Sequence, residues 1–150
     1  MGGSHRYLAD GIDATWSPDD KSVAYTMPNG DLNLINSDGT GAHKLASVGG
    51  AAYPLRWSPD GSTIRFSRDN LGSIWGIASS GSNLHQLLAG WHPSEEKCCG
   101  RWSPDGEFFI FLAGPLRGDY PEGQIYALDE RRGGFPSKSE RAISVDLWTD

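Results

Sequence analysis

A hexapeptide that recurs three times is the sequence feature that most constrains the fold of this chain. Arg-Trp-Ser-Pro-Asp-Gly stands at 56–61 and again at 101–106, and the related Thr-Trp-Ser-Pro-Asp-Asp stands at 15–20. The tryptophans of successive copies are therefore 41 and 45 residues apart in a chain of 150 residues. A motif that returns at this interval indicates one structural unit per copy.

The hexapeptide has the composition of a hairpin turn. Proline holds φ at the second turn position, aspartate suits the third, and glycine adopts the positive φ that closes the hairpin. Asp20 replaces this glycine in the first copy, and aspartate tolerates that conformation at modest cost. We therefore interpret the motif as structural, with its tryptophan ending the incoming strand. The residues given this role are Trp16, Pro18, Asp19, Trp57, Pro59, Asp60, Gly61, Trp102, Pro104, Asp105 and Gly106.

Segments of alternating apolar residues follow each copy, and alternation places those side chains on one face of a strand. The first segments lie at 21–25, 62–66 and 107–111. The second segments begin at a glycine and lie at 30–36, 72–78 and 123–129. A third match, at 42–49 and 84–91, aligns His43 with His85, so these histidines are expected to be structural. Each unit is thus predicted to form about four short strands, as in one propeller blade.

The motif followed by an alternating strand resembles the TolB-type, WD-like propeller repeat. The stretch GWHPSEEKCCGRWSPDGEFFIFLA at 90–113 is also similar to propellers of large bacterial proteins, some of which resemble signalling proteins. The resemblance implies an all-β fold of three four-stranded blades within a single TolB-like fragment, 1–150. The blades are expected at approximately 11–49, 50–90 and 96–150.

Three blades are too few to close a propeller, because closed rings have about four to eight blades. We expect half of a six-bladed propeller that closes by oligomerisation, with a homodimer favoured. Residues 4–9 match the third strand segments, with His5 at the position of His43, and are expected to act as an outer strand exchanged between subunits. The segment 141–150 also alternates and could supply that strand instead.

Composition excludes several classes of partner. A net charge of −6 offers no basic face, so no nucleic acid is expected. No apolar run of 18 residues exists, and MGGSH lacks the apolar region of a signal peptide, so neither a membrane span nor an export signal is expected. The expected partner is the chain itself, with other proteins or peptides as further candidates. No cofactor or metal is expected.

Two connections in the third unit are longer than their counterparts, 89–99 and 113–123. Function concentrates in long loops on a rigid scaffold, so we expect any ligand to bind here. The candidate binding residues are Trp91, His92, Glu95, Glu96, Arg117, Asp119 and Tyr120. The alternative is that these loops are solvated decoration or a contact between subunits.

The adjacent Cys98 and Cys99 are expected to be free thiols, because a bridge between neighbours is strained. Together with His92 they match no standard zinc spacing. The chain also lacks the sequence motifs of nucleophilic, phosphate-binding and zinc-dependent catalysis. These observations favour a non-catalytic scaffold or protein-interaction module that self-assembles. The alternatives are a ligand-binding sensor domain, the accessory propeller of a hydrolase, and an excised or engineered propeller fragment.

Overall fold

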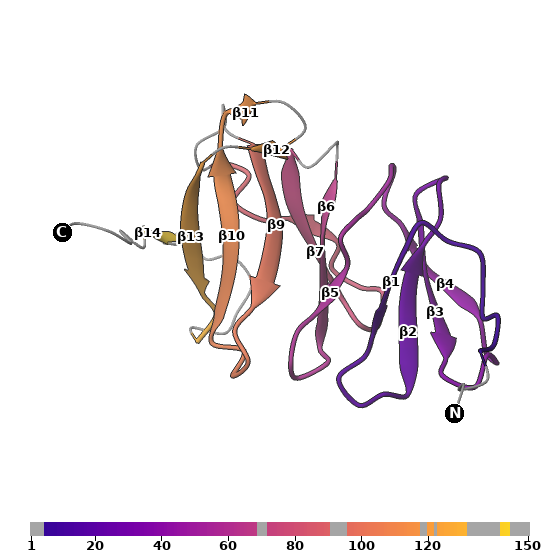
Figure 1. The fold of residues 1–150 in the computed structure, drawn as a ribbon. Helices are drawn as coiled ribbons and strands as arrows, with labels where there is room; N and C mark the ends of the chain where they lie inside the picture. The colour runs from indigo at the N-terminus through magenta and orange to yellow at the C-terminus, as the bar shows by residue number, and fades with distance from the viewer. Residues whose placement is uncertain are drawn as a thin grey trace.

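In the computed structural model, the described part of the chain forms three antiparallel sheets of four strands each and one two-stranded hairpin (Figure 1). The structure describes residues 5–68, 72–90, 96–117, 120–121, 123–131 and 142–144, and this part of the chain contains no helix. The first sheet consists of β1 (Asp13–Trp16), β2 (Ser22–Thr26), β3 (Asp31–Asn36) and β4 (His43–Ser47). The second consists of β5 (Arg56–Trp57), β6 (Thr63–Arg68), β7 (Ser73–Ala78) and β8 (His85–Gln86).

The third sheet departs from this pattern by an insertion. Its strands are β9 (Glu96–Trp102), β10 (Phe108–Gly114), β13 (Gln124–Asp129) and β14 (Ala142–Ser144). A small hairpin, β11 (Leu116–Arg117) and β12 (Tyr120–Pro121), stands between β10 and β13. In every sheet the strands are paired in the order of the sequence. The all-β class predicted from the sequence is confirmed.

The Ser-Pro-Asp segments form the turn that joins the first two strands of each sheet. In the second sheet, the Gly61 amide donates to the Ser58 carbonyl (2.9 Å), and Gly61 has a φ of 72°. The Ser58 hydroxyl donates to Asp60 (2.5 Å) and accepts from the Thr63 amide (3.0 Å). The same bonds recur in the other two turns, where Asp20 and Gly106 have φ of 59° and 74°. The turn chemistry expected from the sequence is therefore present three times.

Each sheet has two distinct faces, which follow from the register of β2, β6 and β10. We call the side with Ala24, Arg65 or Ile110 the forward face, and the side with Val23, Ile64 or Phe109 the rear face. The forward face of the first sheet packs on the rear face of the second, in a core of Ala24, Leu32, Val48, Ala52, Leu55, Ile64, Phe66 and Ile77. The forward face of the second packs on the rear face of the third, in a core of Ile74, Leu87, Leu88, Phe109, Phe111, Ala113, Tyr126 and Leu128.

Residues 5–12, the described part of the N-terminal segment, form no strand and lie against the rear face of the first sheet. The Ile12 amide donates to the Thr26 carbonyl (2.8 Å), and the Arg6 guanidinium donates to the Ser37 carbonyl (2.8 Å). The fourth position of the third sheet is taken by β14 of the same chain, which was the alternative supplier of an outer strand. Exchange of residues 4–9 with another subunit concerns a second copy and stays a prediction.

Candidate binding face of the third sheet

The two long connections meet at one end of the third sheet. The last residues of β10 pair with the first residues of β9, Ala113 with Lys97 and Gly114 with Glu96. The loop after β10 therefore starts beside the connection that leads into β9. The β11–β12 hairpin, drawn at the top of Figure 1, rises from this end of the sheet.

The structure places three of the seven predicted binding residues on backbone elements. Glu96 begins β9, and Arg117 pairs with Tyr120 in the hairpin. The side chains of Arg117 and Tyr120 lie outside the described residues. Trp91, His92, Glu95 and Asp119 also lie outside them, so their role as ligands stays a prediction.

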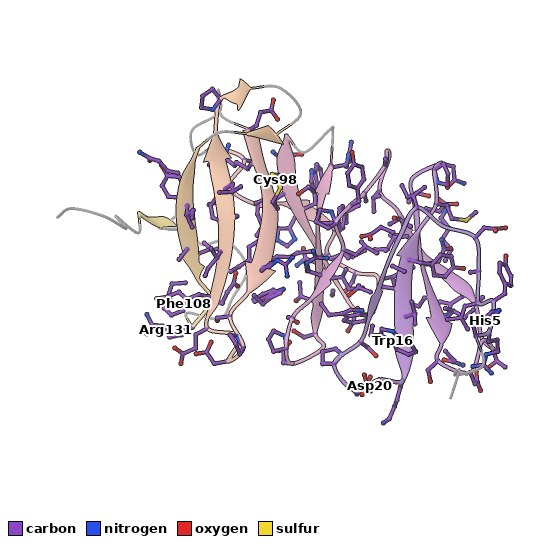
Figure 2. All side chains as sticks on the ribbon, in the orientation of Figure 1. His5, Trp16, Asp20, Cys98, Phe108 and Arg131 are labelled. Atoms are coloured by element: carbon purple, nitrogen blue, oxygen red, sulfur yellow. A yellow bond between two sulfur atoms is a disulfide. The ribbon has the colours of Figure 1, made fainter. Side chains whose placement is uncertain are left out.

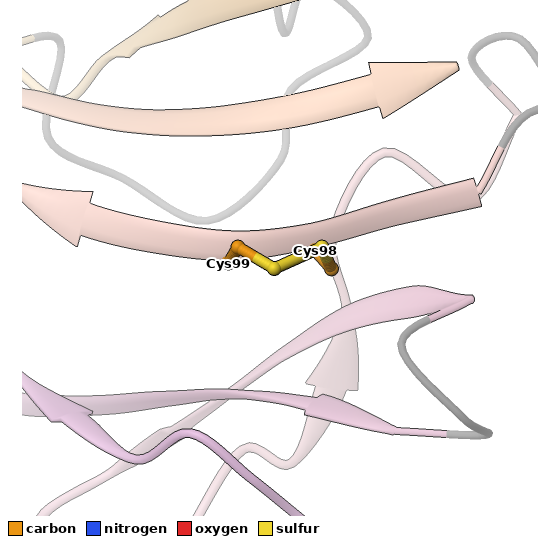
Figure 3. Close-up of a disulfide and its surroundings, with 2 residues drawn as sticks. All are labelled: Cys98 and Cys99. Carbon is orange, nitrogen blue, oxygen red and sulfur yellow. A yellow bond between two sulfur atoms is a disulfide. The ribbon is translucent and has the colours of Figure 1, made fainter. Parts of the chain in front are cut away.

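The two adjacent cysteines form a disulfide, contrary to the expectation of free thiols (Figure 3). That expectation assumed side chains that alternate along a regular strand. The register instead shifts here, because Cys99 and Gly100 together lie opposite the single residue Phe111 of β10. Cys99 adopts a left-handed conformation with φ of 63°, as a residue at a β-bulge can. The bulge removes the alternation and brings both sulfurs to the same side of β9.

Close packing holds the backbone next to the disulfide. A Cβ added at Gly100 would lie 2.1 Å from Cζ of Phe109, so only glycine fits beneath this ring. The Phe109 ring also contacts the Trp102 ring edge to face, with centroids 5.2 Å apart. Cys98 is fully buried and Cys99 is half-buried. Cys99 is thus the more exposed of the two bridged residues.

A buried arginine joins the second and third sheets, and sequence reasoning missed it. Arg65, 7% exposed, lies over the rings of Trp102 (4.3 Å) and Phe109 (4.5 Å). Its guanidinium forms an ion pair with Glu130. The signal in the sequence was a charged residue at a strand position occupied by Ala24 and Ile110 in the other units. Its location at the junction of two sheets makes it a structural cation.

The turn serines have structural partners that account for their hydroxyls. Each donates to the aspartate two residues later, and this hydrogen bond is the main cause of the lowered pKa of Asp19, Asp60 and Asp105. His43 and His85 play a further repeated role, since Nδ1 of each contacts the carbonyl two residues earlier (2.8 and 2.9 Å). These recurring residues stabilise the scaffold in each unit.

An open pocket of about 270 Å³ lies on the rear face of the first sheet. Its lining residues are Leu8, Ala9, Asp10, Gly11, Ile12, Asp13, Ala14, Val23, Tyr25 and Ile35. Within the described part of the chain, no three histidine, cysteine, aspartate or glutamate residues are grouped as metal ligands. The same residues include no helix that could cross a membrane.

Comparison with known proteins gives matches in structure and none in sequence. No family model matches the chain, and neither does any curated protein. The crystal structure of TolB from Acinetobacter baumannii matches 82% of the chain with a TM-score of 0.59 and 26% identity. A protein assigned as TolB from Agrobacterium tumefaciens matches 89% of it with a TM-score of 0.66 and 22% identity. The fold is that of the TolB-type β-propellers.

The TolB-type chains are longer than this one, which spans 30% and 51% of the two just named. The dihydro-heme d1 dehydrogenase NirN also matches, over 93% of this chain and 29% of its own, with a TM-score of 0.63 and 16% identity. At that identity the likeness shows the fold alone. Catalytic and other proteins share this fold, so activity has to be argued from the site.

Proposed function

We propose that the chain is a non-catalytic β-propeller module that completes its ring by pairing head to tail with a second copy. In this assembly the three sheets are three blades, and two chains make six. Six lies within the range of about four to eight blades in which propellers close. Inside the chain, a forward face always packs on a rear face. The observation that carries the proposal is that the chain ends in one face of each kind, the rear face of the first sheet and the forward face of the third.

The forward face of the third sheet is apolar and open. Ile110 is 44% exposed and Ile125 is 41% exposed, and these strand residues share a face with Leu112. The equivalent residues of the other two sheets are buried, Ala24 at 0% and Arg65 at 7% exposed. Among the described residues, the third sheet therefore has no neighbour of the kind that covers this position in the other two.

The rear face of the first sheet is likewise not covered by another sheet in the described part of the chain. Trp16 is 53% exposed, whereas Trp57 at the equivalent position is partly buried against the preceding sheet. The Trp57 indole donates to the Thr15 carbonyl of that sheet (3.4 Å). By the repeat, Trp16 would face the third sheet of a second copy. Figure 2 labels Trp16 on the first sheet and Phe108 on the third.

Light scattering on the full chain and on two variants tests this proposal. Ile110→Lys places a charge on the forward face, and Trp16→Asp places one on the rear face. Each should convert a dimer into a monomer, because a charge buried without a partner opposes association. Ser80→Lys adds a charge in an exposed turn of the second sheet and should leave the dimer intact. A compact monomer for the unmodified chain would overturn the proposal.

Mixing the two variants separates head-to-tail pairing from pairing of like faces. The Trp16→Asp chain keeps an intact forward face, and the Ile110→Lys chain keeps an intact rear face. An equimolar mixture should therefore regain one junction and form a heterodimer, although neither variant associates alone. If like faces met, each variant would keep one intact junction and dimerise alone, and mixing would produce no heterodimer.

A second candidate function is ligand binding at the end of the third sheet, favoured by the meeting of 89–99 and 113–123. Thermal-shift screening with sugars, peptides and metals would identify a ligand. Trp91→Ala and Arg117→Ala should then weaken its binding while the dimer persists. Unchanged affinity in both variants would overturn this candidate. The accessory propeller of a hydrolase stays a prediction for which the described residues supply no specific observation.

A further inference from the structure

We propose that Cys98 and Cys99 form a reversible thiol–disulfide modification site, through which low-molecular-weight thiols set the register between β9 and β10. This inference concerns the chemistry of one bulge and does not depend on how the chain assembles. The bridge lies within β9, the strand of the third sheet that borders the second sheet (Figure 3).

The bridge and the bulge support each other. In the bulge, Cys99 adopts a left-handed φ of 63°, which L-residues other than glycine, asparagine and aspartate rarely adopt. The bond between neighbouring side chains holds Cys99 in this conformation. Once the bond is broken, Cys99 is free to return to the extended conformation that the strand favours. β9 would then have no bulge to accommodate its one extra residue opposite Phe111.

Loss of the bulge would move the first half of β9. On the Trp102 side the register is fixed by Phe109, whose ring packs on Gly100. On the other side the pairs are Cys98 with Leu112, Lys97 with Ala113 and Glu96 with Gly114. These pairs would shift by one residue, and a shift of one residue turns side chains to the opposite face.

The shift would reach the two connections at this end of the sheet. The Lys97 amide lies 3.4 Å from the Gly72 carbonyl of the second sheet, and Lys97 is 6% exposed. β12 of the hairpin contacts β9 as well as β10. The oxidation state of the cysteines would therefore alter the position of the hairpin and of the candidate residue Glu96.

The reaction is an ordinary exchange between thiols and a disulfide. A thiolate attacks Sγ of the half-buried Cys99, the S–S bond breaks, and its electron pair goes to Sγ of Cys98, which takes up a proton. A second thiolate attacks the outer sulfur of the mixed disulfide, and Cys99 leaves as a thiolate and is protonated. Two thiols become one disulfide, and the protein gains two electrons and two protons.

Hydrogen exchange on the full chain, oxidised or reduced with a small thiol, tests the proposal. Intact mass reports the state, because reduction adds two hydrogens and the chain has no other cysteines. On reduction, amides in 96–98 and 112–114 should exchange faster, by roughly tenfold from the cost of a left-handed L-residue. Amides of the first sheet serve as an internal control.

Two substitutions of Cys99 distinguish the effect of losing the disulfide from the effect of losing the left-handed backbone conformation. Cys99→Gly removes the bond but tolerates the left-handed conformation. Hydrogen exchange of 96–98 and 112–114 should therefore stay slow whether or not the small thiol is added. Cys99→Val removes the bond and opposes that conformation, so exchange should be fast in both conditions. Equal exchange of the oxidised and reduced wild type would overturn the proposal, even if a variant failed to fold. Failure of the pair to oxidise in the presence of a disulfide reagent would overturn it as well.

Discussion

Single residues in the hairpin turns show how a short motif stabilises each unit. The serine hydroxyl in each turn both donates to the aspartate and accepts from a strand amide, so one side chain joins the turn to the strand that follows. The pKa of Asp60 is lowered first by the Ser58 hydroxyl and then by the Ser62 amide. A lowered carboxyl pKa is a contribution to folding that depends on pH.

Ser58→Ala should therefore raise the pKa of Asp60 toward its ordinary value. The folded-state pKa lies below the unfolded one, so the ionised carboxyl stabilises the fold above pH of about 4. That contribution is lost as the pH falls through the folded-state pKa. The variant should lose stability at neutral pH and show a smaller change on acidification. NMR titration of the Asp60 carboxyl and urea unfolding measure both effects, with Ser80→Ala as the control.

The Arg65–Glu130 pair gives a second test at this scale. Glu130→Ala removes the carboxylate that compensates a buried guanidinium and should cost about 1–3 kcal/mol of unfolding free energy. Arg65→Met combined with Glu130→Ala should recover much of this loss, because an apolar side chain can replace a buried ion pair. Urea unfolding measures the unfolding free energy of the single and double variants. A double variant less stable than the single one would contradict this account.

At the scale of elements, β9 is shaped by the contact between Gly100 and the Phe109 ring. Gly100→Ala should destabilise the chain by about 1–3 kcal/mol, because the added methyl overlaps the ring. Gly90→Ala is the matched control, since a Cβ there would meet nothing within 4 Å. Thermal or urea unfolding compares the two. Equal stabilities would show that the ring moves aside without cost.

The elements also show what the sequence could predict. The turns and the strands around them are encoded by local signals, such as proline followed by aspartate and glycine at 59–61. The bulge at Cys99 and the burial of Arg65 depend instead on pairing with β10 and on packing between sheets. The sequence pattern of a single strand does not indicate its pairing irregularities or its contacts with another sheet. For the candidate binding loops, the sequence indicated unusual length but not how their side chains are arranged. The β11–β12 hairpin accounts for the added residues in 113–123.

At the scale of the whole molecule, the N-terminal segment covers part of the face proposed for assembly. Val23 and Ile35 are 6% and 2% exposed, although no other sheet formed by the described residues covers the rear face of the first sheet. They line the pocket together with Leu8 and Ile12. In the proposed dimer, the segment must therefore move to let a second copy bind at this face.

Deletion of residues 1–10 should consequently tighten the dimer, because the rear face no longer has to be uncovered. Sedimentation or light scattering across a dilution series measures the change. Alanine substitution at Tyr7, which is 73% exposed, is a control that leaves the segment in place. A weaker dimer after the deletion would instead support exchange of residues 4–9 between subunits.

The faces of the sheets also give the proposed assembly a direction. Every sheet packs its rear face on the preceding sheet and presents its forward face to the next one. The addition of further copies through this contact therefore does not stop at a fixed number. The angle between successive sheets then decides whether copies meet in a small ring or continue as a filament. Arg65 lies at one of the two internal junctions that set this angle. A substitution there could change the stoichiometry of the product while leaving each chain folded.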